Sequence, residues 1–340
     1  MLFWKNKKIL DFILLFSALK FASLIIVFFA AESFGENAFR YDDFSGFIDR
    51  GSSFWQVNYL YELFVNLVAG SGYPLPISLI LNAVSDLSIG IALILIFPEA
   101  TKLTFVCYAI FLGLNPYDSL YYFKCDPGMI LPIGFCGALL FHRLPGHSNR
   151  TMVFSMLLAL CVWRAQFAVS LAALFVIKSF SQRTWSAFLR ATLLIALSAW
   201  YSMIYAPRAF LGAEHYGNSV FSPENNPFAE ILLNGIRLIG FREKYYTLGI
   251  ETFFSEPLLI QIFFVGFGIF NFVSLATLAV FAVFKDRRYA YLLALFAPLA
   301  MSLISVSHLR YLIPFFPILY FPISIVMANM IPKVTRARWS

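Results

Sequence analysis

The residues best suited to chemistry in this 340-residue chain are two adjacent carboxylates, Asp42 and Asp43, in the segment Arg40-Tyr-Asp-Asp-Phe-Ser-Gly-Phe-Ile-Asp49. The segment follows a long apolar run, so we expect these acids at the edge of a membrane, facing a lipid-borne substrate. One carboxylate could act as a general base that deprotonates an acceptor hydroxyl. The other could position that hydroxyl or help to hold a divalent cation through its oxygens. A solvated acidic loop is the alternative, and the residues alone leave both interpretations open.

Phosphate could be bound by charged residues in two other segments. Lys124 and Asp126 follow a short apolar run, and the aspartate could orient a phosphate-contacting lysine. An interfacial ion pair is the alternative. Arg164 lies between two apolar runs, where its guanidinium needs a partner. The phosphate of an anionic lipid would suit this bidentate donor, and a carboxylate such as Asp126 is the alternative.

A third segment, His308-Leu-Arg-Tyr-Leu-Ile-Pro-Phe-Phe-Pro317, lies between the last two apolar runs. His308 and Arg310 could bind a phosphate or the leaving group, and Tyr311 precedes two prolines at the start of the last run. The alternative is a pair of side chains at a helix end that extend their polar groups to the membrane surface.

Two charged residues, Lys20 and Asp86, fall in the middle of the first two apolar runs. Charged residues inside a membrane are functional candidates by default, so a proton or ion relay is one interpretation. Because the two runs are antiparallel neighbours, a structural ion pair between Lys20 and Asp86 is the simpler expectation.

The elements that must position these residues are membrane-spanning helices. The chain is 60% hydrophobic and 13% charged, about half the charge of a soluble domain. Several apolar runs approach 20 residues, the length that crosses a bilayer as a helix, and no alternating strand pattern is visible. We therefore predict an all-α integral membrane protein with a single domain, 1–340. About ten spans are expected, at 10–31, 74–97, 102–115, 127–142, 151–163, 165–179, 187–206, 257–284, 289–306 and 311–331.

Basic residues in short loops predict the orientation of these spans. With both termini cytoplasmic, the cytoplasmic side carries 15 basic and three acidic residues, and the opposite side carries nine basic and 14 acidic residues. Residues 151–179 are split into two short spans, which keeps Arg164 away from the bilayer centre and indicates a cavity on the outer side. Two outer segments, 32–73 and 207–256, are expected to carry short interfacial helices near 54–69 and 228–239.

Several function classes lack their sequence patterns. The chain has no phosphate-binding loop, no dinucleotide fingerprint and no GxSxG motif. The four cysteines have no metal-binding spacing, so no metal site is predicted from them. The net charge of +7 follows from the cytoplasmic face and does not predict a nucleic-acid partner.

The layout resembles a known group of membrane enzymes. It looks like the polytopic GT-C glycosyltransferases and the related Wzy-type O-antigen polymerases. The features that carry this resemblance are an acidic motif in the first outer loop, charges in the second, Arg164 between two short helices, and the final Arg310-Tyr311 before prolines. The resemblance implies a polyprenyl-phosphate or diphosphate sugar donor. It also implies that Asp42 or Asp43 is the catalytic base. A glycan or lipid-linked acceptor at the outer face of a bacterial inner membrane would receive the sugar, as in lipopolysaccharide biosynthesis.

The expected function is therefore a glycosyltransferase with its active site on the periplasmic or exterior side. The expected donor is a sugar carried by a polyprenyl lipid such as undecaprenyl phosphate, and no nucleotide cofactor is needed because the phosphate linkage is already activated. Lys124, Arg164 and Arg310 would stabilise the leaving phosphate. A flippase or transporter of lipid-linked sugars is the alternative, and it predicts charges along a path through the bilayer.

Overall fold

The computed structural model consists of helices wherever it describes the chain. The described residues are 7–33, 74–122, 169–174, 176–177, 185, 189, 192–193, 196–197, 226–240, 258–304 and 312–337. They belong to two compact units, Met1–Arg164 with Phe315–Ser340 and Ala165–Pro314, which we call unit 1 and unit 2. Because each unit is described by itself, the single domain expected from the sequence stays a prediction.

Four described helices are long and apolar enough to cross a membrane, as the sequence predicts for their ranges. They are α1 (Lys7–Ser33), α4 (Pro74–Ile96), α14 (Leu258–Phe284) and α17 (Phe316–Ala337). These helices match the predicted spans 10–31, 74–97, 257–284 and 311–331 to within six residues at each end. The total of about ten spans and the cytoplasmic position of the termini stay predictions.

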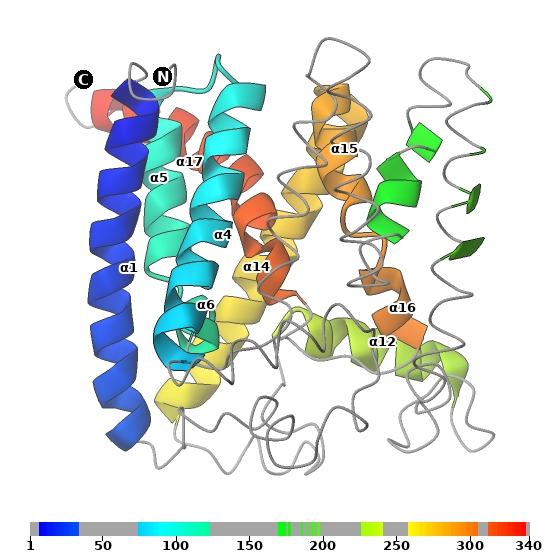
Figure 1. Cartoon of the computed structure of the whole chain (residues 1–340), viewed down its shortest axis with the longest axis horizontal. Helices are drawn as coiled ribbons and strands as arrows, with labels where there is room; N and C mark the ends of the chain where they lie inside the picture. The colour runs from blue at the N-terminus through cyan, green and yellow to red at the C-terminus, as the bar shows by residue number, and fades with distance from the viewer. Residues whose placement is uncertain are drawn as a thin grey trace. The chain divides into compact units, whose positions relative to one another are not determined.

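Unit 1 contains α1, α4, α17 and two short helices, α5 (Lys102–Gly113) and α6 (Pro116–Tyr122). Lys8 near the start of α1 donates hydrogen bonds to the carbonyl oxygens of Pro98 and Ala100, both at 2.9 Å. These contacts join the N-terminal end of α1 to the C-terminal end of α4, so the two helices run antiparallel (Figure 1). Lys102 at the start of α5 forms an ion pair with Asp11 at 2.7 Å, so α5 starts beside the same end of α1.

Aromatic side chains from α1, α4, α5 and α17 fill the centre of unit 1. The rings of Phe12 and Tyr108 stack with their centroids 5.5 Å apart. Phe321 of α17 contacts Phe97 and Phe105 at centroid distances of 5.0 and 5.8 Å. Such offset and tilted ring pairs contribute specific attraction beyond simple burial, so part of the phenylalanine content serves packing between helices.

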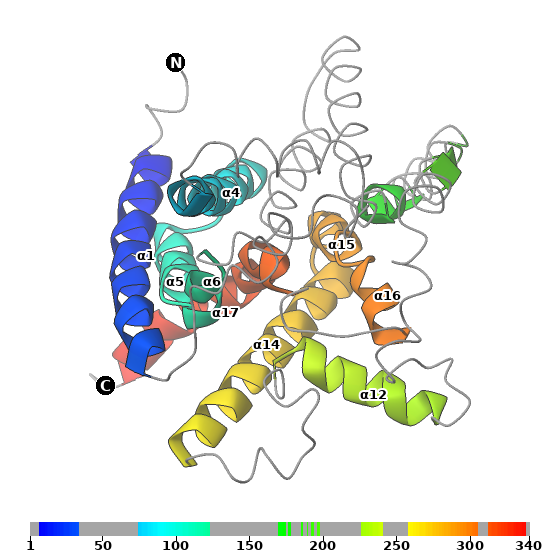
Figure 2. The same cartoon turned by 60° about the horizontal axis from the view of Figure 1, so that its bottom comes forward.

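Unit 2 contains α14, an amphipathic helix α12 (Pro227–Leu238) and two short helices, α15 (Arg287–Ala294) and α16 (Leu299–Ile304) (Figure 2). The amphipathic helix expected near 228–239 is confirmed. Asn226 caps it by accepting hydrogen bonds from the backbone N–H groups of Phe228 and Ala229. Gly240 ends it at a φ of 97°, a conformation that glycine adopts without strain.

The predicted span 289–306 is wrong as a single helix, because the structure divides it into α15 and α16. Pro298 lies in the turn between them, and proline cannot donate the hydrogen bond that a continuous helix requires. Ser170 donates to the carbonyl oxygen of Leu295 at 2.8 Å, and Asn234 donates to that of Leu303 at 2.9 Å. Polar side chains thus satisfy one carbonyl group at the break and one near the C-terminal end of α16.

Candidate functional site

The eight residues predicted from the sequence to act as the base or to bind the donor all lie outside the described residues. The structure therefore neither brings them together nor separates them. They are Asp42, Asp43, Lys124, Asp126, Arg164, His308, Arg310 and Tyr311. Within the described ranges, no group of three His, Cys, Asp or Glu residues could hold a metal ion.

The described part of unit 1 contains a different polar site, at the break between α5 and α6. The sequence Asn115-Pro116 causes the break, since the residue before a proline is disfavoured in a helix and proline suits the first position of the next one. Asn115 caps α6 by accepting a hydrogen bond from the backbone N–H of Asp118 at 3.0 Å. The predicted span 102–115 is consequently a helix of 12 residues, about 18 Å long, that runs beside less than half of the length of α1.

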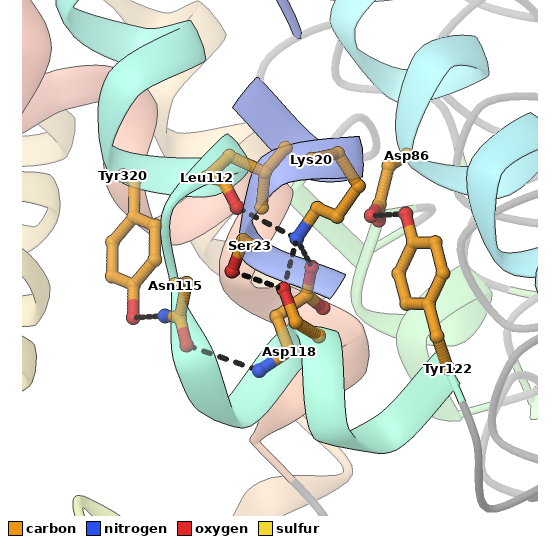
Figure 3. A network of polar contacts seen from close by, with 9 residues as sticks. Lys20, Ser23, Asp86, Leu112, Asn115, Asp118, Tyr122 and Tyr320 are labelled. Carbon is orange, nitrogen blue, oxygen red and sulfur yellow. Dashed lines mark hydrogen bonds and ion pairs between the residues drawn. The ribbon is translucent and has the colours of Figure 1, made fainter. Parts of the chain in front are cut away.

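Lys20, the central residue of α1, lies where α5 ends (Figure 3). Its ammonium group donates to Asp118 Oδ2 at 2.6 Å, to the carbonyl oxygen of Leu112 at 2.9 Å and, more weakly, to Ser119 Oγ at 3.4 Å. The side chains of Lys20 and Asp118 are only 4% and 5% exposed. The ammonium thus has three acceptors, one of them a carbonyl oxygen near the end of α5, where helix carbonyls lack partners within the helix.

Asp86, in the middle of α4, is the second buried carboxylate of the site and accepts a short hydrogen bond from the hydroxyl of Tyr122. Asp86 also interacts through its charge with both Asp118 and Lys20. Because Tyr122 and Asp118 are four residues apart on α6, they lie on one face of that helix and together join α4 to α1. We call Lys20, Asp86, Asp118 and Tyr122 the central cluster.

Hydrogen bonds from other polar groups surround the central cluster. The hydroxyls of Ser23 and Ser119 are 2.7 Å apart, and the side-chain amide of Asn115 donates to the hydroxyl of Tyr320 at 2.8 Å. Tyr108 donates to the carbonyl oxygen of Pro317 at 2.7 Å. These contacts fix α6 against α1, and α5 against α17, so the short helices are held by polar groups as well as by apolar packing.

The central cluster is costly to build in a membrane. A single lysine or aspartate at the centre of a spanning helix costs about 2.5–3.5 kcal/mol even on a lenient insertion scale. The Lys20–Asp118 pair offsets part of that cost, and non-helical backbone at membrane depth is tolerated where protein surrounds it. Chemically, the cluster combines one cation, two carboxyl groups and a phenol, which are groups that hold or transfer protons.

The structure corrects one expectation about these residues. Lys20 pairs with Asp118, not with Asp86, because the break after α5 allows α6 to bring Asp118 back toward the middle of α1. Asp118 is therefore buried, although the sequence suggests an outer-loop position for it. The sequence carries two indications of this arrangement, namely the Asn115-Pro116 break and the shared helical face of Asp118 and Tyr122.

Comparisons of the chain with protein-family models, with curated proteins and with solved structures gave no significant match. The central cluster and the sequence pattern therefore carry the functional argument.

Proposed function

We propose that this chain is a membrane glycosyltransferase. It transfers a sugar or oligosaccharide from a polyprenyl-phosphate or diphosphate donor to a cell-surface glycan or lipid-linked acceptor. The reaction takes place at the outer face of a bacterial inner membrane, as a single transfer or as the polymerisation step of an O-antigen-like polysaccharide. The proposal rests on the outer-segment residues of the sequence and on the topology of unit 1.

The observation that carries the proposal is where two chain segments join unit 1. Residues 34–73, which contain Asp42 and Asp43, connect the C-terminal end of α1 to the N-terminal end of α4. In Figure 1 both ends lie opposite the end of unit 1 where α5 begins, and α6 lies in the half of the unit toward them. Residues 123 onward, with Lys124 and Asp126, continue from α6. The proposed base and a proposed phosphate-binding lysine thus belong to segments that leave the same half of unit 1.

The proposed reaction is a base-assisted displacement. Asp42 or Asp43 takes the proton from an acceptor hydroxyl. At the same time, the oxygen of that hydroxyl forms a bond to the anomeric carbon of the donor sugar. The bond between that carbon and the phosphate oxygen breaks, and the phosphate leaves with the electron pair. Lys124, Arg164 and Arg310 stabilise the charge on the leaving phosphate, and His308 and Tyr311 contribute to binding the donor. A divalent cation held by the acids could add to this stabilisation.

The proposal is tested with Asp42→Asn and Asp43→Asn, singly and together, in cells whose surface glycan depends on this chain. The double variant is expected to lose the glycan, because a carboxamide cannot act as the base. Asp49→Asn changes an acid of the same segment and is the matched control, with glycan at the wild-type level. Normal glycan in both single variants and in the double variant would show that the base assignment is wrong.

The central cluster favours a second candidate, a flippase or transporter of lipid-linked sugars. Such proteins use charged residues and broken helices near the middle of the membrane, and Lys20, Asp86 and the α5–α6 break fit that description. The two candidates differ in product: the enzyme makes a new glycosidic bond, whereas a flippase moves its lipid between leaflets without changing it.

A further inference from the structure

The central cluster contains more acid than base. Within the described residues, Lys20 is the one cation of the cluster, whereas Asp86 and Asp118 are two buried carboxyl groups. Lys20 is paired with Asp118, so an ionised Asp86 would leave one uncompensated negative charge between α1, α4 and α6. A phenol can donate a hydrogen bond to that charge but cannot neutralise it. Buried charges without a partner are avoided in proteins, usually by a change of protonation.

Among the described residues, the titratable groups that face this pair come from four helices. From α1 comes Lys20, and from α6 come Asp118 and Tyr122, while α5 and α17 contribute two further phenols, Tyr108 and Tyr320. These phenols are neutral at physiological pH because a tyrosine ordinarily ionises near pH 10. No described element therefore supplies a second positive charge, and among the described residues the charges balance when Asp86 carries one proton.

We propose that the central cluster is an intramembrane proton-binding site, in which Lys20 and Asp118 form a permanent ion pair and Asp86 takes up and releases one proton. Uptake converts the Asp86 carboxylate and one hydronium ion into a carboxylic acid and one water molecule, and release is the reverse. Tyr122 keeps its hydrogen bond to Asp86 Oδ2 in the protonated state, since the carbonyl oxygen of the acid is still an acceptor. The inference does not depend on the proposed transferase activity, because it rests on other residues.

Proton binding at Asp86 affects the contacts that α6 makes with α4 and α1. Tyr122 is the direct link between α4 and α6 in the cluster, and α6 is also tied to α1 through Ser119 and Ser23. When Asp86 loses its proton, the new charge repels Asp118 and attracts Lys20, so it competes for the partner that holds α6 against α1. The protonation state of one residue therefore acts on the contact of three helices.

The test is infrared spectroscopy of the purified full chain in lipid nanodiscs, with aspartate isotopically labelled at its side-chain carboxyl carbon. The wild-type protein is expected to show the C=O stretch of a protonated carboxylic acid. This band should shift with the label and with exchange into D₂O, and it should shrink reversibly as the pH is raised. Asp86→Asn should abolish the band completely. Asp11→Asn, which removes a partly exposed aspartate of α1 that also pairs with a lysine, should leave it in place.

A second variant keeps the test decisive if Asp86→Asn does not fold. Tyr122→Phe removes only the hydroxyl that donates to Asp86, so the band should remain and move to higher frequency. Absence of a labelled acid band from the folded wild-type protein at about pH 6 and above, where ordinary aspartates are ionised, would overturn the proposal. A band that survives in folded Asp86→Asn, or one that Tyr122→Phe leaves unshifted, would overturn it as well.

Discussion

We expect the substitution Asp118→Asn, which breaks the ion pair at the centre of unit 1, to lower the stability of the protein. This change keeps the size of the side chain but removes the negative charge 2.6 Å from the Lys20 ammonium. Because both side chains are 5% exposed or less, solvent cannot replace the lost partner. Among the described residues, Lys20 would keep only uncharged acceptors, namely the Leu112 carbonyl, the Ser119 hydroxyl and the amide oxygen of the substituted side chain.

The expected magnitude follows from two independent scales. Breaking a buried ion pair by removing one partner typically costs about 3–5 kcal/mol, and a lysine at the centre of a spanning helix costs about 2.5–3.5 kcal/mol. Asp86 lies close enough to interact with Lys20 through its charge, so partial rescue favours the lower end of these ranges. We expect the free energy of unfolding to fall by about 3 kcal/mol, roughly a hundredfold in the folding equilibrium.

The assay is equilibrium unfolding of the purified chain in mixed detergent micelles. Lys20→Met combined with Asp118→Asn should recover most of the loss, because the double variant no longer buries an unpaired charge. Asp11→Asn is the matched control, since it breaks the exposed pair with Lys102, and its effect should be much smaller. If Asp118→Asn were no more destabilising than Asp11→Asn, or if the double variant were no better than Asp118→Asn, the pair would not have the role described.

Two further predictions concern a close helix contact and a helix cap. Gly113→Ala should destabilise the protein by about 1–3 kcal/mol, because the added Cβ would lie 2.8 Å from Leu19 Cβ of α1. Gly266→Ala, whose added Cβ has no atom within 4 Å, is the control and should be neutral or stabilising. Thermal melts of both variants check this. The side-chain hydrogen bond from Arg288 lowers the pKa of Asp286 below its ordinary value of 3.8. The stabilisation from this charge is therefore present above the unfolded pKa and is lost as the pH falls through the folded pKa. The stability difference between wild type and Asp286→Asn, which keeps a capping side chain, should shrink as the pH is lowered below about 4, and a constant difference would contradict this assignment.

Hydropathy predicts long helices well and breaks poorly in this chain. The ranges of α1, α4, α14 and α17 follow from uninterrupted apolar runs, whose length is set by the thickness of a bilayer. The predicted span 102–115 already ends at the Asn115-Pro116 break, whereas the break near Pro298 falls inside the predicted span 289–306, where the run is otherwise apolar and average hydropathy does not reveal it. The residues of the turn determine where the helix ends at these positions. Proline removes a backbone donor, and a capping or buried polar side chain pairs with a backbone N–H or C=O group that the break leaves without a helical partner.

The central cluster shows where sequence reasoning reaches its limit. Lys20 and Asp86 are recognisable as intramembrane charges from the sequence, but the partner of Lys20 depends on the path of the chain after Gly113. Only the folded unit brings Asp118 to the middle of α1. The outer-segment residues, led by Asp42 and Asp43, stay predictions from the sequence.

The most direct test of the proposed function is sugar transfer by the purified full chain in proteoliposomes. The donor is a radiolabelled polyprenyl-phosphate-linked sugar extracted from native membranes and supplied in the outer leaflet together with a lipid-linked acceptor. We predict labelled, elongated acceptor from the wild-type protein and none from the Asp42→Asn, Asp43→Asn double variant, with Asp49→Asn active. Movement of the labelled donor between leaflets without any glycosylated acceptor would contradict the proposal and identify a flippase instead.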